Sequence, residues 1–190
     1  MRAFLAIDLP MELKKKLWEL KEEVPPQIKI KWVELPNFHI TLKFFGNISE
    51  SFLEKIFKES ENIIKNYQFF QLMLDQLGFF PKKKIPRVVW IGLKTQDETL
   101  FDLQKALQKI FKKLKINSEK EEFHPHITLF RVKSIENLES FKDYFEKISK
   151  KTESLKGLNF QVKELVFFKS TLLPTGPLYE PLYKIPLKNV

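Results

Sequence analysis

The stretch Phe38-His39-Ile40-Thr41-Leu42 returns later in the chain as His126-Ile127-Thr128-Leu129. The chain has only three histidines, so an identical tetrapeptide around two of them indicates a shared purpose. The residues around each histidine are apolar and β-prone, which predicts a strand in both copies. Because side chains alternate between the faces of a strand, each copy places its histidine and threonine together on one face. If the two copies face each other, two His/Thr pairs meet in one cleft and form a two-histidine acid–base site.

Composition limits the class of protein. A chain of 190 residues is expected to form one domain or two closely joined halves. Apolar residues make up 43% of the chain and 19 of its residues are phenylalanine, so it can fill a sizeable core. No apolar run reaches the roughly 18 residues of a membrane span, and the segment 1–8 reaches an acidic residue too early for a signal peptide. The absence of cysteine excludes disulfides, thiolate zinc sites and cysteine nucleophiles, and favours a cytoplasmic protein.

Charge points to the class of partner. The formal net charge of +9 favours a polyanionic partner such as nucleic acid. The alternative is a lysine-rich soluble protein of the kind found in thermophiles. The basic loop at Lys82–Lys84 fits either an RNA contact or a solvated turn.

The apolar periodicity predicts four amphipathic helices and about eight strands. The helices are expected to begin at Pro10 with an apolar stripe to Val24, at a capping box of Ser51 and Glu54, at Thr95 with Glu98, and near Leu138. The strands are expected at 2–9, 28–33, 38–46, 69–80, 88–93, around 126–131, 160–168 and 178–187. The second half repeats the rhythm of the first, and no linker separates them. The pattern therefore predicts an α+β duplication within a single domain, residues 1–190.

Other chemistries find little support in the motifs. None of the five glycines lies in a phosphate-loop or dinucleotide pattern, and no serine lies in a nucleophile-elbow context. His124 and His126 could share a metal ion, but no acid cluster supplies further ligands at a suitable spacing, so no metal is expected. We interpret His124 as structural and Pro125 as fixing the approach to the strand. The alternative for His39 and His126, two hydrogen-bonded core histidines, is disfavoured by their identical frames.

Three segments carry a family resemblance: Met1–Ile7, His39–Gly46 and Pro125–Arg131. With them the chain resembles the two-histidine phosphoesterases, and among these the RNA 2′,3′-cyclic phosphodiesterases, also called 2′-5′ RNA ligases. The resemblance extends over essentially the whole chain. It implies a bilobal α+β fold with pseudo-twofold symmetry, in which two mainly antiparallel sheets flank a central cleft and the helices lie outside.

The same resemblance implies an activity. A cytoplasmic, monomeric enzyme would hydrolyse 2′,3′-cyclic phosphate ends of RNA to 2′-phosphomonoesters without metal or cofactor, and could run backward as a 2′-5′ ligase. Its partners would be RNA ends, with tRNA fragments among the candidates. His126 would act as the base on water and His39 as the acid at the leaving 3′ oxygen. Two imidazoles with pKa values near the ordinary 6.5 could hold opposite protonation states at neutral pH.

Further residues are expected to bind the substrate. Thr41 and Thr128 are candidates for hydrogen bonds to phosphate oxygens, although threonine is also common in strands for other reasons. Five residues after each histidine stand Phe44 and Arg131, which the resemblance assigns to base stacking and to phosphate binding. Strict alternation turns both away from the cleft, so they need a β-bulge or a strand end to face it. The alternative for Phe44 is a place in the core.

Two other functions remain open at this stage. One is a phosphodiesterase for another small cyclic phosphate, such as a cyclic nucleotide or an ADP-ribose derivative. The other is a non-catalytic RNA-binding module on the same scaffold, which the intact histidines and threonines argue against.

Overall fold

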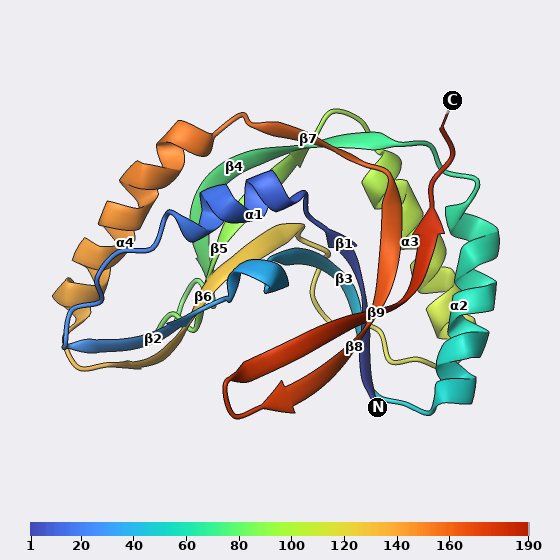
Figure 1. Ribbon diagram of the computed structural model, residues 1–190, viewed down its shortest axis with the longest axis horizontal. Coiled ribbons are helices and arrows are strands. Elements are labelled where there is room, and N and C mark those ends of the chain that lie inside the picture. The colour runs from blue at the N-terminus through green and yellow to red at the C-terminus, as the bar shows by residue number, and fades with distance from the viewer. Residues whose placement is uncertain (190) are drawn as a thin grey trace.

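A computed structural model describes residues 1–189; Val190, the last residue of the expected domain, lies outside the described residues. The chain alternates strands with helices (Figure 1). The strands are β1 (Arg2–Asp8), β2 (Ile28–Trp32), β3 (His39–Asn47), β4 (Phe70–Phe80), β5 (Val88–Thr95), β6 (His126–Ile135), β7 (Asn159–Val162), β8 (Glu164–Leu173) and β9 (Gly176–Pro186). The helices are α1 (Met11–Trp18), α2 (Glu50–Ile64), α3 (Thr99–Lys113) and α4 (Leu138–Thr152), with the short 3₁₀ helices η1 (Leu35–Asn37) and η2 (Glu153–Leu155).

The strands form two sheets, which define two lobes. Lobe 1 contains the sheet of order β3-β1-β8-β9, and lobe 2 contains the sheet of order β2-β6-β5-β4-β7. Neighbouring strands within both sheets are antiparallel. Figure 1 shows the sheets side by side, with α4 at the outer side of one and α2 and α3 at the outer side of the other. The expected bilobal α+β architecture is confirmed.

Aromatic contacts attach the helices to the outer face of each sheet. In lobe 1, Phe57 of α2 packs against Phe167 of β8, with ring centroids 6.3 Å apart. In lobe 2, the Trp32 Nε1–H donates a hydrogen bond of 2.9 Å to the hydroxyl of Tyr144 on α4, so the indole and the phenol are both satisfied in the core. The faces of the sheets that carry no helix are left to form the cleft.

The lobes do not coincide with the two halves of the chain, which corrects the simplest form of the duplication. β2 comes early in the chain but belongs to lobe 2, paired with β6. The strand expected at 160–168 is two strands: β7 closes the lobe 2 sheet and β8 joins lobe 1, with Lys163 between them. A continuous apolar run cannot show that the chain changes sheets, because both strands bury their inner faces equally well.

Three helix starts or ends also differ from expectation. α1 ends at Trp18, although the apolar stripe continues to Leu20, which the following turn buries. α2 begins after Ser49, whose Oγ accepts a hydrogen bond from the Phe52 N–H at 3.2 Å, so Ser51 lies inside the first turn. α3 begins at Thr99, and the side chain of its N-cap residue, Glu98, makes no capping hydrogen bond. Thr95, expected at the start of this helix, is the last residue of β5.

A β-bulge occurs at the same position in each histidine strand. In β3, Thr41 pairs with Ala6 but Lys43 pairs with Leu5, so Leu42 is the additional residue. In β6, Thr128 pairs with Trp90 but Phe130 pairs with Val89, so Leu129 is the additional residue. In β3 the consecutive residues Leu42 and Lys43 are both buried, and Phe44 after them is exposed. In β6 the same pattern holds for Leu129, Phe130 and Arg131. The bulges therefore return Phe44 and Arg131 to the face of the histidines.

Candidate active site

The two histidine strands face each other across the cleft between the lobes. β3 and β6 belong to different sheets, yet they include Cα pairs within 8 Å of each other. The positive charge that His126 can carry lowers the pKa of His39, as expected for two groups in one cleft. His39, Thr41 and Phe44 share one face of β3, in lobe 1.

The same arrangement places His126, Thr128 and Arg131 on the opposite side, on lobe 2. Arg131 is exposed, and its charge lowers the pKa of His126. With the register of β6, these three residues share one face of that strand.

A backbone carbonyl fixes the tautomer of each histidine. The Nδ1 of His39 lies 2.6 Å from the carbonyl oxygen of Asn37, and the Nδ1 of His126 lies 2.6 Å from that of His124. Because a carbonyl can only accept, Nδ1 carries the hydrogen in both rings. In the neutral imidazole, Nε2 then keeps its lone pair and is free to accept a proton. Asn37 and His124 occupy the same position, two residues before each histidine.

The second ring nitrogen differs between the two copies. Thr41 Oγ1 lies 2.8 Å from His39 Nε2, so its hydroxyl donates to the lone pair of the neutral ring. Within the described residues, Thr128 makes no corresponding bond to His126. The identical tetrapeptides are therefore not in identical states: the Nε2 of His39 is engaged by Thr41, and that of His126 has no hydrogen-bond partner in the described part of the chain.

Burial shifts the protonation of both histidines. Burial lowers the pKa of His39 to about 4, and its bond to the Asn37 carbonyl and the charge of Asp8 offset only part of this shift. Burial also lowers the pKa of His126, and the nearby charges of His124 and Arg131 lower it further. Both imidazoles are thus neutral at pH 7 in the free protein. The opposite protonation states expected for unperturbed imidazoles are not the resting state.

Aromatic rings cause much of this burial. Phe4 lies 5.0 Å from the His39 ring, between centroids, and Tyr179 meets the same ring edge-on at 5.3 Å. On the other side of the cleft, Phe80 approaches His126 edge-on at 5.3 Å, and Trp90 lies 5.9 Å away. These rings exclude water from each imidazole, which disfavours its charged form.

Phe44 is exposed to solvent in the cleft. The side chain is 57% exposed, and its ring lies 5.8 Å from Phe4, the neighbour of His39. A core phenylalanine would be almost fully covered, so the alternative reading of Phe44 as a core residue is wrong.

Three groups near His39 were not singled out in the sequence. Asn37 could have been found from its place two residues before the motif, which His124 shares. Asp8 is the register partner of His39 and forms a 2.8 Å salt bridge with the buried Lys14. Tyr179 comes from β9, near the end of the chain, and no local pattern connects it to the histidine.

The described residues show neither a metal-binding cluster nor a membrane-spanning helix. Among residues 1–189, no three or more His, Asp or Glu side chains are grouped so that they could hold a metal ion. No helix in the same part of the chain is long and apolar enough to cross a membrane.

Comparison with known proteins identifies the family. The family model described as LigT like phosphoesterase matches the chain twice, over residues 7–90 and 91–179, and each match contains one histidine motif. The chain belongs to this family. The two successive matches also agree with the internal duplication, and the membership confirms the family expected from the paired motifs.

Similar proteins cover nearly the whole chain. A protein of Methanocaldococcus jannaschii named RNA 2′,3′-cyclic phosphodiesterase is 36% identical over 95% of this chain and 97% of its own length. One of the same name from Thermotoga maritima is 31% identical over 97% and 94%. Among solved structures, a Thermus thermophilus protein superposes with a TM-score of 0.79 at 26% identity, covering 100% and 99% of the two chains. Escherichia coli LigT complexed with 3′-AMP superposes with a TM-score of 0.75 at 26% identity, covering 98% and 97%.

The low pKa of His39 predicts a loss of stability in acid. Its imidazole has a pKa of about 4 when folded and about 6.5 when unfolded. The unfolded state therefore binds more protons between these values, and stability that is complete above pH 6.5 falls as the pH decreases through this window. At pH 5 we expect a loss on the order of 2 kcal/mol from this group.

Urea unfolding at pH 7 and at pH 5 measures this contribution. His39→Gln removes the titrating group, so the variant should lose about 1–2 kcal/mol less than the wild type between the two pH values. Equal losses in the two proteins would contradict the shift.

Proposed function

We propose that the protein hydrolyses RNA 2′,3′-cyclic phosphate ends to 2′-phosphomonoesters, using His126 as base and His39 as acid. The observation that carries the proposal is the pair of imidazoles on opposite sides of one cleft, each with Nδ1–H bonded to a backbone carbonyl. This leaves two Nε2 atoms for proton transfer at one phosphate. The names of the relatives from M. jannaschii and T. maritima support the same substrate.

In the proposed reaction, the Nε2 lone pair of His126 removes a proton from water as the water oxygen attacks phosphorus. The bond from phosphorus to O3′ breaks on the opposite side, and O3′ takes a proton from Nε2 of His39. Each such proton transfer typically contributes about 10²–10⁴-fold in rate. Negative charge develops on the phosphoryl oxygens, where Thr41, Thr128 and Arg131 would stabilise it.

The acid must acquire a proton that the free protein lacks at pH 7. A phosphodiester anion beside an imidazole raises its pKa, so binding of the substrate favours the protonated acid. Burial depresses the pKa of His39 strongly, which taken alone would favour His39 as the base. The opposite assignment rests on two other features. Phe44 places the nucleoside, and hence the leaving O3′, toward lobe 1, and the open Nε2 of His126 suits a base.

The same groups could catalyse the reverse reaction. If the 5′-hydroxyl of a second RNA takes the place of water, His126 can deprotonate it and a 2′-5′ linkage results. We propose that cytoplasmic RNA ends, tRNA fragments among them, are the substrates.

The first experiment uses a short RNA with a 2′,3′-cyclic phosphate end. We expect conversion to the 2′-phosphomonoester in the presence of EDTA, because the proposed steps need only the histidines. The product is identified by its resistance to a 3′-specific phosphatase. No conversion under any condition would overturn the proposed function. Loss of activity in EDTA with recovery on adding a divalent cation would overturn the metal-free mechanism alone.

The division of labour between the histidines can be tested with a leaving group that needs no proton. On a p-nitrophenyl phosphodiester, His39→Ala should lose far less activity than it loses on the RNA end. His126→Ala should be severely impaired on both substrates, because water must still be deprotonated. The opposite pattern would show that the two roles are exchanged.

Arg131 and Phe44 should affect different kinetic constants. Arg131→Ala should lower kcat on all cyclic ends alike, by about 100-fold, because it removes a donor to the phosphate. Phe44→Ala should mainly raise KM, by the equivalent of about 1–3 kcal/mol for one lost base stack.

The controls use the exposed positions of both side chains. Lys133→Ala removes an exposed cation from the same strand as Arg131 and should leave kcat within about twofold of the wild type. Phe44 is 57% exposed, so Phe44→Ala should fold normally. If that variant were instead grossly unstable, or changed kcat without KM, its assignment to base stacking would be wrong.

A further inference from the structure

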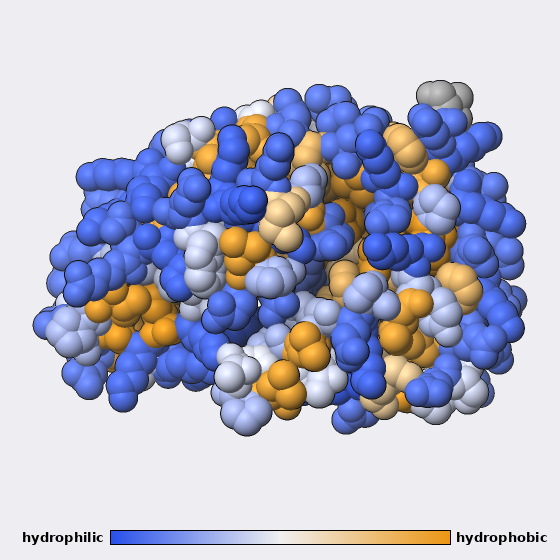
Figure 2. All heavy atoms as spheres, viewed as in Figure 1, coloured by the Kyte–Doolittle hydropathy of each residue, from blue (hydrophilic) through white to orange (hydrophobic). Residues whose placement is uncertain are grey.

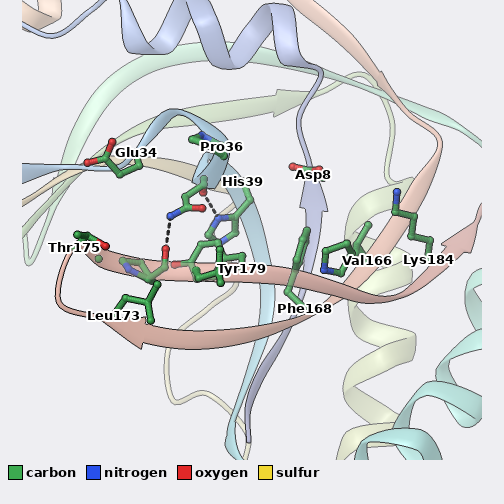
Figure 3. A pocket seen from close by; sticks show the side chains of 15 residues that line it. Asp8, Glu34, Pro36, His39, Val166, Phe168, Leu173, Thr175, Tyr179 and Lys184 are labelled. Atoms are coloured by element: carbon green, nitrogen blue, oxygen red, sulfur yellow. Dashed lines mark hydrogen bonds between the residues drawn. The ribbon is translucent and has the colours of Figure 1, made fainter.

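A pocket of about 600 Å³ opens beside His39 on the lobe 1 side of the cleft. Figure 3 shows it lying along the β8–β9 hairpin, with Thr175 and Lys184 toward opposite ends and His39 between them. Phe44, Arg131 and His126 are not among its lining residues. The pocket is therefore a space next to the proposed reaction centre, separate from the groups assigned to the terminal base and the phosphate.

Two hydrogen bonds hold the hairpin in place over this pocket. The Asn37 side-chain amide donates to the carbonyl oxygen of Pro177 at 2.9 Å, and the Lys31 ammonium donates to that of Thr175 at 3.3 Å. Asn37 is also the residue whose backbone carbonyl accepts the Nδ1–H of His39. The wall of the pocket and the orientation of the histidine thus depend on the same residue.

The lining suits a nucleoside. Its volume falls in the range of small-molecule sites, and its walls are mainly apolar with a few polar groups. A base can stack on the aromatic ring of Tyr179. It can also pack against the pyrrolidine rings of Pro177 and Pro181. Asn37 and Asp8 can accept hydrogen bonds from a base, and the charge of Asp8 is already balanced by Lys14.

Lys184 provides a cation for a phosphate. It is exposed at one end of the pocket and forms no salt bridge with any residue of the described range 1–189. Glu34 and Thr175 lie toward the other end (Figure 3). A phosphodiester in the pocket would therefore be attracted toward Lys184.

We propose that this pocket binds the nucleotide preceding the cyclic end, so that the preferred substrate is RNA of two or more nucleotides and not a cyclic mononucleotide. The inference rests on the proposed function. Phe44 follows His39 along β3, and the pocket residues Pro36 and Asn37 precede His39. The base-stacking site and the pocket therefore lie on the two sides of His39, the proposed acid. With O3′ at His39 and the terminal base on Phe44, the 5′ side of the terminal ribose leads toward the pocket.

The test compares two substrates: a nucleoside 2′,3′-cyclic phosphate and a dinucleotide that ends in the same cyclic phosphate. One additional stacked base is worth about 5- to 150-fold, so kcat/KM of the wild type should favour the dinucleotide by a factor in this range. Equal, measurable values for the two substrates would overturn this inference and leave the proposed function standing. Absence of turnover on both would instead overturn the proposed function, and this inference with it.

Two pairs of variants locate the preference in the pocket. Leu178→Trp should fill it, because Leu178 is 47% exposed and lines it; Leu182→Trp is the control, 38% exposed on the same strand but outside the lining. Lys184→Glu removes the cation, and Lys105→Glu makes the same charge change on the outer helix α3.

Leu178→Trp and Lys184→Glu should each bring the ratio of kcat/KM for the two substrates close to one, and the two controls should retain the wild-type preference. Circular dichroism and urea unfolding establish that each variant is folded. If Leu178→Trp lowers kcat/KM equally for both substrates, the pocket holds the terminal nucleoside and the proposal is wrong. A preference that survives in both pocket variants would place the preceding nucleotide elsewhere and overturn it as well.

Discussion

The hydrogen bond from the Nδ1–H of each histidine to a backbone carbonyl two residues earlier is the interaction on which the site depends. At 2.6 Å in both copies, it fixes the ring orientation and the tautomer together. Without it, either nitrogen could carry the hydrogen and the ring could rotate about its side-chain bonds. Since the bond uses backbone and not a second side chain, it needs only the local path of the chain, which explains how the same arrangement can be built twice.

The β-bulges extend this local control to the substrate-binding side chains. A regular strand would place only the histidine and the threonine in the cleft and would turn the residue five positions after the histidine into the core. The additional residue, Leu42 in β3 and Leu129 in β6, reverses the alternation. It also buries two consecutive residues in each strand, and in β3 one of them is Lys43. Its ammonium donates a hydrogen bond of 2.6 Å to the Asn117 carbonyl oxygen and forms a salt bridge of 3.2 Å with Glu119. These partners offset the free-energy cost of burying the charge.

The environments of the two motifs differ more than their sequences do. In lobe 1, Phe4 stacks on Phe168 with ring centroids 5.3 Å apart and meets Tyr179 edge-on at 4.9 Å. The β8–β9 hairpin then projects beyond the sheet toward lobe 2 (Figure 1) and exposes leucines such as Leu172, 63% exposed, at its tip. Hydrophobic residues are visible on this hairpin within a surface that is otherwise mostly hydrophilic (Figure 2). On lobe 2, Phe80 of β4 and Trp90 of β5 pack against His126 instead, so the two imidazoles have different neighbours.

Most of the elements and the paired histidine motifs could be predicted from the order of residues alone. Repetition of His-Ile-Thr-Leu identified the histidines, period-two and helical patterns located most strands and helices, and the positions of Phe44 and Arg131 required the bulges that the strands contain. These features are local, so a short stretch of chain is enough to specify them. The assignment of β2 and β7 to lobe 2, and of β8 and β9 to lobe 1, depends instead on how the folded chain packs. This packing alone brings Tyr179 onto His39 and aromatic rings around both imidazoles, which lowers their pKa values. Burial and contact between distant segments depend on which faces of the elements pack together. The residues adjacent in sequence do not specify that packing.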